Sequence, residues 1–376
     1  MGPSPDPDAI ARAIASVEAP DPDWAGRAAD RQARLTMPPG ALGRLLDLGR
    51  QLAGLQRTDR PMGHPALVAV FAADHGVAEA GVSAYPQAVT GQMVANYLAG
   101  GAAVNVLARR AGAEVRVVDL GVRHLPEGLK GHLCRPIRAG TSNLLEGPAM
   151  TRTEAYRAVA VGLDLADRWA GREGFRVIAL GEMGIGNTTT AAILAAALTG
   201  AGVDRVVGRG TGVDDEGLAR KVRVVERALA LHLGSDRDPW EILARLGGFE
   251  ILGLAGLAIG AARHRALVVL DGFISGVAGL VAARLCPPAA ESFVGSHLGP
   301  EPGHAVVLGA LGLDPLLSLG LRLGEGTGAA LALPMIGSAA DILREMATFE
   351  SATVSGPTRA EGPDPTALAP RSRDRE

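Results

Sequence analysis

The stretch ALVAVFAADHG, residues 66–76, carries the clearest indication of the fold. Its apolar run has the composition of a buried strand, and it ends in an acidic residue and a glycine, Asp74 and Gly76. An alanine-rich segment with the length of a helix follows it along the chain. A strand followed by such a helix is the start of a βαβ unit. It therefore predicts an α/β fold with a Rossmann-like parallel sheet flanked by helices.

The same pattern recurs along the chain. The runs EVRVVDLG (114–121), FRVIALGEMG (175–184) and ALVVLDGF (266–273) reach an acid near their ends, namely Asp119, Glu182 and Asp271. A further strand is expected at ESFVGS (291–296). Since the carboxyl ends of parallel strands face the ligand crevice, these acids are expected at one edge of the sheet. The alternative is that each acid only occupies a turn or caps a helix, and both interpretations stay open.

Composition excludes several classes of function. The 376 residues carry a formal net charge of −3, which gives no reason to expect a nucleic acid or an acidic membrane as partner. Two separate cysteines, Cys134 and Cys286, predict neither a disulfide framework nor a thiolate zinc site. The N-terminus lacks an export signal, and the apolar stretch 251–262 is too short to span a bilayer. We therefore expect a cytoplasmic protein without a membrane span.

The two ends of the chain differ from its middle. Residues 1–59 are expected to form helices with proline-rich starts, as an attachment to a large α/β domain over 60–320. Residues 351–376 are rich in proline and charge and are expected to be disordered.

The segment GEMGIGNTTTAAILAAALTG (181–200) follows a strand and opens a helix, which Asn187, Thr188 or Thr189 could cap. Glycines and free amides at a helix start form an anion site. The segment fits neither the Walker A pattern nor GxGxxG, so a phosphate monoester suits it better than a triphosphate or dinucleotide. An ordinary turn between strand and helix is the alternative.

Two further segments carry candidate polar groups. Lys221, one of two lysines in the chain, lies early in a helix that begins near Asp214 or Asp215, where it would either bind phosphate or remain solvated. In residues 81–107, Ser83, Tyr85 and Gln92 could frame a flat heterocycle, or Tyr85 could only anchor a loop while Met93 joins the core.

Metal and covalent chemistry have no visible motif. The eight histidines form no HExxH pattern and no close set with carboxylates, so no metal or other cofactor is expected. A GxSxG nucleophile motif is also missing. His75, directly after Asp74, could be a base, although a hydrogen-bonded histidine at a strand end is the commoner case.

Glu325 lies between two glycines in LRLGEGTGAAL (321–331), immediately before a helix-forming run. A helix start stabilises the carboxylate and would make it a weak base, whereas burial raises its pKa. If a planar ligand closed over Gly324 and Gly326, desolvation could bring Glu325 near the pKa that a general base needs.

Five separated segments carry a resemblance to a known family. They are MPPGALGRL (37–45), FAADHGVAEAGVSAYPQAVTGQM (71–93), GEMGIGNTTTAA (181–192), GGFEILGLAG (247–256) and LRLGEGTGAALALPM (321–335). Together they resemble nicotinate-nucleotide:dimethylbenzimidazole phosphoribosyltransferases over residues 35 to about 350. The resemblance implies transfer of ribose 5-phosphate from nicotinate mononucleotide to 5,6-dimethylbenzimidazole, giving α-ribazole 5'-phosphate for the lower ligand of cobalamin. It also implies a homodimer, and a small helical domain built from residues 1–59 and 321–350.

Site residues follow from the same resemblance. Glu325 matches the general base that takes the proton of the benzimidazole N–H. The expected contacts of the benzimidazole are Ser83, Tyr85, Gln92, Met93, Leu323 and Gly324. Those of the nucleotide and its phosphate are Glu182, Gly184, Gly186, Asn187, Thr188, Lys221 and Arg322.

Two other classes of protein stay possible at this level. A noncatalytic module could use the same sheet edge to bind nicotinate mononucleotide without turnover. A dehydrogenase or methyltransferase could use the glycine-rich turns, but the first strand is followed by no clean GxGxxG.

Overall fold

The computed structural model describes residues 6–234 and 238–356. The expected disordered tail therefore lies outside the described residues from position 357 onward. Within the described part, no helix combines the length and the apolar character needed to cross a membrane.

Six parallel strands form one sheet, in the order β3-β2-β1-β4-β5-β6. Their bounds are β1 Ala66–Ala73, β2 Glu114–Gly121, β3 Leu133–Cys134, β4 Val177–Met183, β5 Leu267–Leu270 and β6 Phe293–Gly295. This confirms the predicted α/β fold with a Rossmann-like parallel sheet. β3 was not expected, because two residues are too short to show a hydrophobic pattern.

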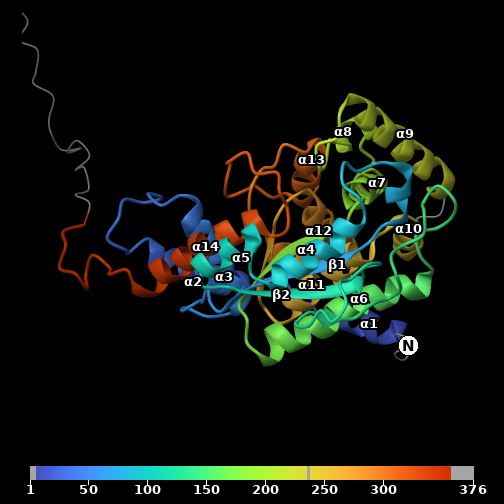
Figure 1. The fold of residues 1–376 in the computed structure, drawn as a ribbon. Helices are drawn as coiled ribbons and strands as arrows, with labels where there is room; N and C mark the ends of the chain where they lie inside the picture. Colours follow the sequence, from blue (N-terminus) through green and yellow to red (C-terminus); the bar gives the residue numbers. More distant parts are fainter. Residues whose placement is uncertain (1–5, 235–237, 357–376) are drawn as a thin grey trace, which may run out of the picture.

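Helices cover both faces of the sheet (Figure 1). Their bounds are α1 Pro7–Ala15, α2 Pro22–Gln32, α3 Arg44–Gln56, α4 Ala88–Leu98, α5 Ala103–Arg110, α6 Arg152–Ala166, α7 Asn187–Thr199, α8 Val203–Val206, α9 Asp215–His232, α10 Pro239–Leu246, α11 Phe249–Arg263, α12 Phe273–Leu285, α13 Pro302–Leu311 and α14 Thr327–Glu345. Short turns of other helix types span Gly76–Ala80, Asp167–Arg172 and Pro287–Ser292.

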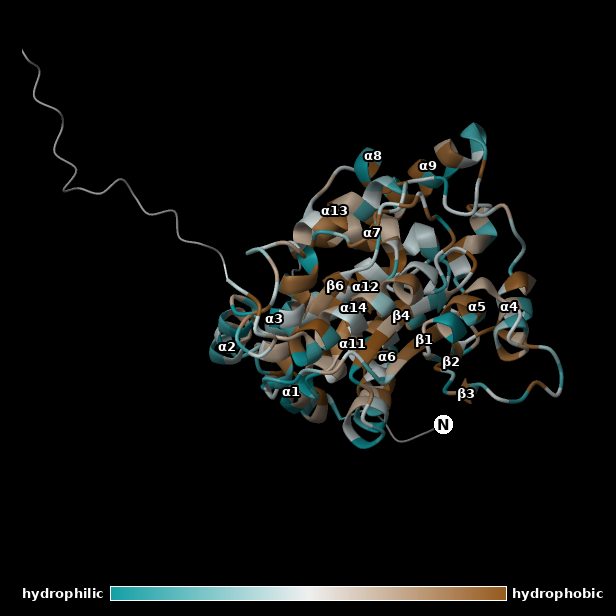
Figure 2. Cartoon of the chain, turned by 90° about the vertical axis from the view of Figure 1, so that its left-hand side faces the viewer, coloured by the Kyte–Doolittle hydropathy of each residue, from teal (hydrophilic) through white to brown (hydrophobic). Residues whose placement is uncertain are grey.

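The alternation of side chains along each strand separates two hydrophobic cores. Leu67 and Phe71 of β1 join the core that contains α6, α7, α11 and α12. Val68 and Val70 of the same strand join the core with α3, α4, α5 and α14. Both faces of the strands are therefore apolar, as Figure 2 shows for the centre of the molecule.

The apolar stretch 251–262, which the sequence favours as a buried helix because it is too short to span a bilayer, forms most of α11, in which every residue from Phe249 to Ala262 is buried. α11 packs against α6 through glycines. A side chain added at Gly162 of α6 would place its Cβ 2.0 Å from the Gly253 carbonyl oxygen of α11. The helices therefore cross at backbone contact.

A substitution at this crossing tests the packing. Gly162→Ala should lower the free energy of unfolding by about 1–3 kcal/mol, because the added methyl group forces two helix backbones apart. Gly26→Ala in α2 is the matched control: an added Cβ there meets nothing within 4 Å, so it should stabilise by about 0.5–1 kcal/mol. Urea unfolding of both variants measures the difference, and an unchanged Gly162→Ala protein would contradict the close crossing.

The N-terminal and C-terminal helices lie side by side. α3 packs on α2 and on α14, which appear in blue and orange-red in Figure 1. Leu35 pairs with Thr348 in an antiparallel bridge, and the Arg31 side chain donates to the Leu343 carbonyl. α1 lies elsewhere, against α6 and α11.

Candidate active site

The order of the strands reverses between β1 and β4, since the chain adds β2 and β3 on one side and β5 and β6 on the other. In open α/β sheets, the crevice beside such a switch point is where ligands bind. Glu182 lies at the end of β4, and Asp271 directly follows β5. The loop that leads into α14 packs onto these two acids.

Glu325 sits in this loop, 8% exposed, with a backbone φ of +64°. Its neighbours are also left-handed, at +79° for Gly324 and +94° for Gly326. A Cβ at Gly324 would lie 2.6 Å from Glu182 Oε1, and one at Gly181 of β4 would lie 2.5 Å from the Glu325 carbonyl oxygen. The glycines around Glu325 thus allow the loop to lie directly on the end of β4.

Asp271 holds the start of α14. Its two carboxylate oxygens accept from the Gly326 amide at 3.0 Å and the Ala329 amide at 2.9 Å. These are N–H groups at the helix start that have no partner within the helix. Asp271, which directly follows β5, therefore holds the backbone beside Glu325 in place, because Glu325 immediately precedes Gly326.

Burial shifts the pKa of the two glutamates. Desolvation raises the pKa of Glu325 to about 7, with the Tyr97 hydroxyl opposing the shift and Asp271 adding to it. Desolvation raises the pKa of Glu182 to about 8, against the Glu325 amide that donates to Glu182 Oε1 at 3.3 Å. The side-chain amide of Asn187 also donates to Glu182, at Oε2 and 2.5 Å. Both carboxyl groups can therefore hold or release a proton near neutral pH.

Tyr97, in α4, faces Glu325. Its ring is 2% exposed, and burial followed by the charge of Glu325 raises its pKa. The hydroxyl makes no hydrogen bond of ordinary geometry to any described residue. The hydroxyl nevertheless lowers the pKa of the nearby Glu325 carboxyl group, against the effect of burial.

The start of α7 and Lys221 form a second corner of the crevice. Gly186, at φ +98°, is the residue before α7, and no side chain caps the helix. The expected capping by Asn187, Thr188 or Thr189 is wrong, because Asn187 turns back to Glu182. Among the described residues, no hydrogen bond uses the amides of Gly186 and Thr188. Two donors at a helix start are thus unused.

Lys221 reaches this corner from α9. Of the two residues expected at the start of that helix, Asp214 is the one that caps it. The ammonium group donates to Thr188 Oγ1 at 3.1 Å, and the residue is 1% exposed. Burial lowers its pKa to about 8, and Glu301 opposes the shift. A buried cation beside unused amides suits a phosphate.

The predicted benzimidazole contacts lie mostly at the surface. Tyr85 is 54% and Leu323 57% exposed, and Gln92 is exposed as well. Arg322, which was predicted to contact the phosphate, is also exposed. Ser83 Oγ shares a hydrogen bond of 3.3 Å with Thr211 Oγ1, which joins this segment to the loop before α9. Met93 is half-buried against the core. Gly324 adjoins Glu182, as described above, and Gly184 fits against the Ala73 carbonyl.

The other strand-end acids have structural partners. Asp74 accepts from the Thr90 hydroxyl and the Arg123 amide, both at 2.8 Å. Asp119 Oδ1 accepts from the Gly121 and Val122 amides, also at 2.8 Å. His75 is fully buried, with Glu250 at 2.7 Å and Thr190 at 2.9 Å on its two ring nitrogens. The turn interpretation therefore suits Asp74 and Asp119, and His75 is not exposed to a ligand.

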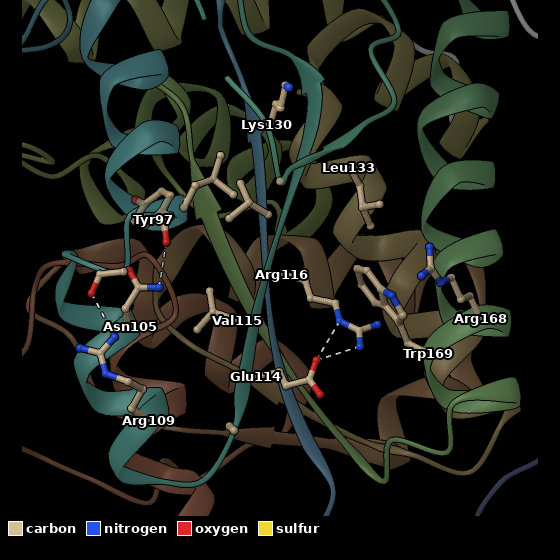
Figure 3. Close-up of a pocket in the computed structure, with 15 residues that line it drawn as sticks. Tyr97, Asn105, Arg109, Glu114, Val115, Arg116, Lys130, Leu133, Arg168 and Trp169 are labelled. Atoms are coloured by element: carbon tan, nitrogen blue, oxygen red, sulfur yellow. Dashed lines mark hydrogen bonds and ion pairs between the residues drawn. The ribbon is translucent and has the colours of Figure 1, made fainter. Parts of the chain in front are cut away.

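A cavity of about 710 Å³ meets this site only at Tyr97, which is one of its lining residues (Figure 3). Its lining includes the first half of β2, parts of α4 and α5, and Trp169. Arg116 points toward Trp169 and is paired with Glu114 at 2.8 Å. None of the predicted site residues lines the cavity. The candidate site is therefore the crevice around Glu325, where the buried titratable groups meet.

Three members of the site were not predicted as site residues. Asp271 was expected only as a strand-end acid, and Tyr97 and Glu301 were not singled out. Glu301 Oε1 accepts from the Gly210 amide at 2.8 Å, while Oε2 is buried without a partner among the described residues. The only signal for Asp271 was its repeat of the strand-acid-glycine pattern, and no local signal pointed to the other two.

The chain is similar to known proteins over most of its length. A family model described as phosphoribosyltransferase matches residues 17–354. The nicotinate-nucleotide–dimethylbenzimidazole phosphoribosyltransferase of Desulforudis audaxviator is 48% identical over 348 residues, covering 93% of this chain and 98% of that protein. The Geobacter sulfurreducens protein of the same name is 50% identical over 330 residues, covering 87% and 94%. The crystal structure of the Thermus thermophilus enzyme of that name matches with a TM-score of 0.84 at 46% identity, covering 90% of this chain and 100% of that one.

The order of the six parallel strands and the helices on both faces of the sheet define a doubly wound α/β protein. With the family model matched over most of its length, the chain belongs to the phosphoribosyltransferase family.

Proposed function

We propose that the protein transfers the 5-phosphoribosyl group from nicotinate mononucleotide to 5,6-dimethylbenzimidazole, releasing nicotinate and α-ribazole 5'-phosphate. The observation that carries the proposal is Glu325, a buried carboxyl group whose pKa is raised to about 7 in the crevice. Its relatives carry the name of this activity at about half identity over most of the chain. The product supplies the lower ligand of cobalamin.

In the proposed reaction, one benzimidazole nitrogen attacks C1' of the ribose while the bond from C1' to the nicotinate nitrogen breaks. The electron pair of that bond neutralises the pyridinium charge of the leaving nicotinate. Glu325 accepts the proton of the other benzimidazole nitrogen. A base with a pKa near the working pH contributes about 100- to 10,000-fold to such a rate.

Glu182 has a different part in this proposal. With its pKa raised to about 8, it is mostly protonated at neutral pH. A neutral Glu182 does not repel the Glu325 carboxylate, so one of the two acids can be charged while the other keeps its proton. Asn187 holds Glu182 in place.

The phosphate of the nucleotide is proposed to bind where Lys221 meets the start of α7. The ammonium group and the unused amides of Gly186 and Thr188 are all donors, and no carboxylate accepts a hydrogen bond from Lys221 among the described residues. Gly184 permits close approach of this turn. Arg322, from the loop before Glu325, would add a second charge from the surface.

The planar base is proposed to lie between the 81–93 segment and the loop at Leu323 and Gly324. Tyr85 and Leu323 are exposed apolar groups on these two segments, so an aromatic ring lying between them would remove both from water. Ser83 and Gln92 would contact its edge, and Met93 would support it from the core side.

We extend the proposal to the state of the protein in the cell. The family resemblance supports a cytoplasmic homodimer, and a division into a large domain over 60–320 and a small helical one over 1–59 and 321–350. The packing of α3 against α14 supports the joining of the two ends of the chain.

Incubating the protein with nicotinate mononucleotide and 5,6-dimethylbenzimidazole tests the function directly. We expect equal amounts of nicotinate and α-ribazole 5'-phosphate, identified by mass after chromatography. A parallel reaction without the benzimidazole is the control, and it should release no nicotinate. If the nucleotide binds saturably but no product forms at every pH tested between 6 and 9, the proposal is contradicted. A noncatalytic binding module would then be favoured.

A further inference from the structure

Three side chains with metal-binding atoms meet at the end of β2, outside the crevice just described. They are Asp119, His132 and Cys134, and one ligand atom of each lies within 4.8 Å of the others. Asp119 is buried, His132 half-buried and Cys134 exposed. The sequence predicted no thiolate metal site, because neither cysteine lies in a recognisable motif.

Strand pairing explains the meeting. Asp119 of β2 is in register with Cys134 of β3, and side chains paired in this way lie on the same face of the sheet. His132 precedes Cys134 by two residues, so the period of two places it on that face as well. A His-x-Cys pair and a strand-end acid are thereby brought together although Asp119 is far from them in the chain.

The three groups have coordination capacity left over. Asp119 Oδ1 accepts two backbone amides, which fixes the orientation of the carboxylate, while Oδ2 makes no hydrogen bond among the described residues. His132 Nδ1 is buried and also lacks a partner there. Cys134 is a free thiol. A buried ring nitrogen without a partner is costly, and a metal ion would satisfy it.

We propose that Asp119, His132 and Cys134 bind one zinc ion per chain, or a divalent ion of the same borderline-soft class. Thiolate, imidazole and carboxylate are all ligands of zinc, whereas a thiolate disfavours magnesium and calcium. Ligand atoms around a tetrahedral zinc are roughly 3.5 Å apart, so binding draws the side chains together through rotation of the exposed Cys134. The thiol proton passes to solvent, and a water molecule takes the fourth position.

This ion would be separate from the transfer reaction. β1 lies between β2, which carries Asp119, and β4, which carries Glu182, so about 10 Å separates the two strands. Its effect would be structural. β3 pairs with β2 over two residues only, and the ion would fasten β3 to the sheet through side chains.

Cobalt titration of the chelator-treated protein tests the site, because a cobalt–thiolate bond gives a charge-transfer band in the near ultraviolet. We expect saturation at one cobalt per chain, displacement by zinc, and a rise in the melting temperature with zinc. Cys134→Ser should abolish the band. Cys286→Ser is the matched control and should keep it, because that thiol is buried near the Ile14 carbonyl.

His132→Gln provides an independent variant and should weaken cobalt binding at least 10-fold while the protein stays folded. The proposal is wrong if no thiolate band forms, if it survives Cys134→Ser, or if His132→Gln binds cobalt as the wild type does. The readout is independent of turnover, so a failed zinc site and a failed transfer reaction would be distinguished.

Discussion

Replacing Glu325 with glutamine should lower kcat by about 100- to 10,000-fold, with little change in the Kd of nicotinate mononucleotide. The amide has the size of the carboxyl group but cannot accept the benzimidazole proton, so only the step that needs a base is affected. Turnover by nicotinate release and nucleotide binding by calorimetry separate the two quantities. Glu291→Gln, at an exposed position, is the matched control and should retain full activity.

The pH dependence identifies which acid is the base. As the proposed base, Glu325 would act only when deprotonated, so kcat/KM should rise with pH through an apparent pKa of about 7. If Glu182 controlled the reaction, the rise would instead centre near its pKa of about 8 and persist in the Glu325→Gln protein. Near-normal turnover in that variant would show that the proton goes elsewhere.

Stability measurements test whether Glu325→Gln loses activity only because the variant unfolds. Burial raises the pKa of Glu325 from 4.5 to about 7, so the folded protein binds the proton more tightly than the unfolded chain does. The free energy of unfolding therefore falls as pH rises from about 4.5 to 7, and stays lower above it. Glu325→Gln removes this loss of stability, so the variant should unfold at a higher urea concentration than the wild type at pH 8.

The second large effect is expected at Lys221. Lys221→Gln should raise the Kd of nicotinate mononucleotide by 30-fold or more, because removing one partner of a buried charge pair costs about 2–5 kcal/mol. The phosphate would lose its buried cation, while Glu325 and the attacking base are unchanged. Calorimetric titration of the nucleotide measures the loss.

Two controls make this result specific. Lys130→Gln replaces the only other lysine, which is exposed, and should leave nucleotide binding unchanged. Nicotinate riboside lacks the phosphate, so its weaker binding should be nearly the same in wild type and Lys221→Gln. Equal losses for nucleotide and riboside would mean that Lys221 supports the fold of the crevice and does not bind the phosphate.

Much of the fold could be predicted from local patterns. Five strands were expected within a few residues of β1, β2, β4, β5 and β6, because continuous apolar runs bounded by glycine are typical of buried parallel strands. The burial of α11 and the cap of α9 were also predictable. β3 was not predictable, because only its pairing with β2 makes these two residues a strand. The absence of a side-chain cap on α7 was not predictable either, because Asn187 donates to Glu182 instead of capping the helix.

The candidate site was also predictable only in part from the sequence. The glycines around Glu325 and the acids at the strand ends are visible in the chain, but nothing local shows which acids are buried together. Asp74 and Asp119 received backbone and hydroxyl partners, whereas Glu182 and Asp271 met the loop of Glu325. Residue type therefore predicted candidates, and packing selected among them.

By itself, the sequence determined the alternation of strands and helices, the edge where the carboxylates gather and the glycine setting of Glu325. These are local properties, because apolar periodicity and backbone freedom depend on neighbouring residues. The folding of distant segments onto one another places Glu325 against Glu182, 143 positions away, and raises the pKa of Glu325 to about 7. Desolvation depends on every atom that excludes water around a group, and most of those atoms come from distant parts of the chain.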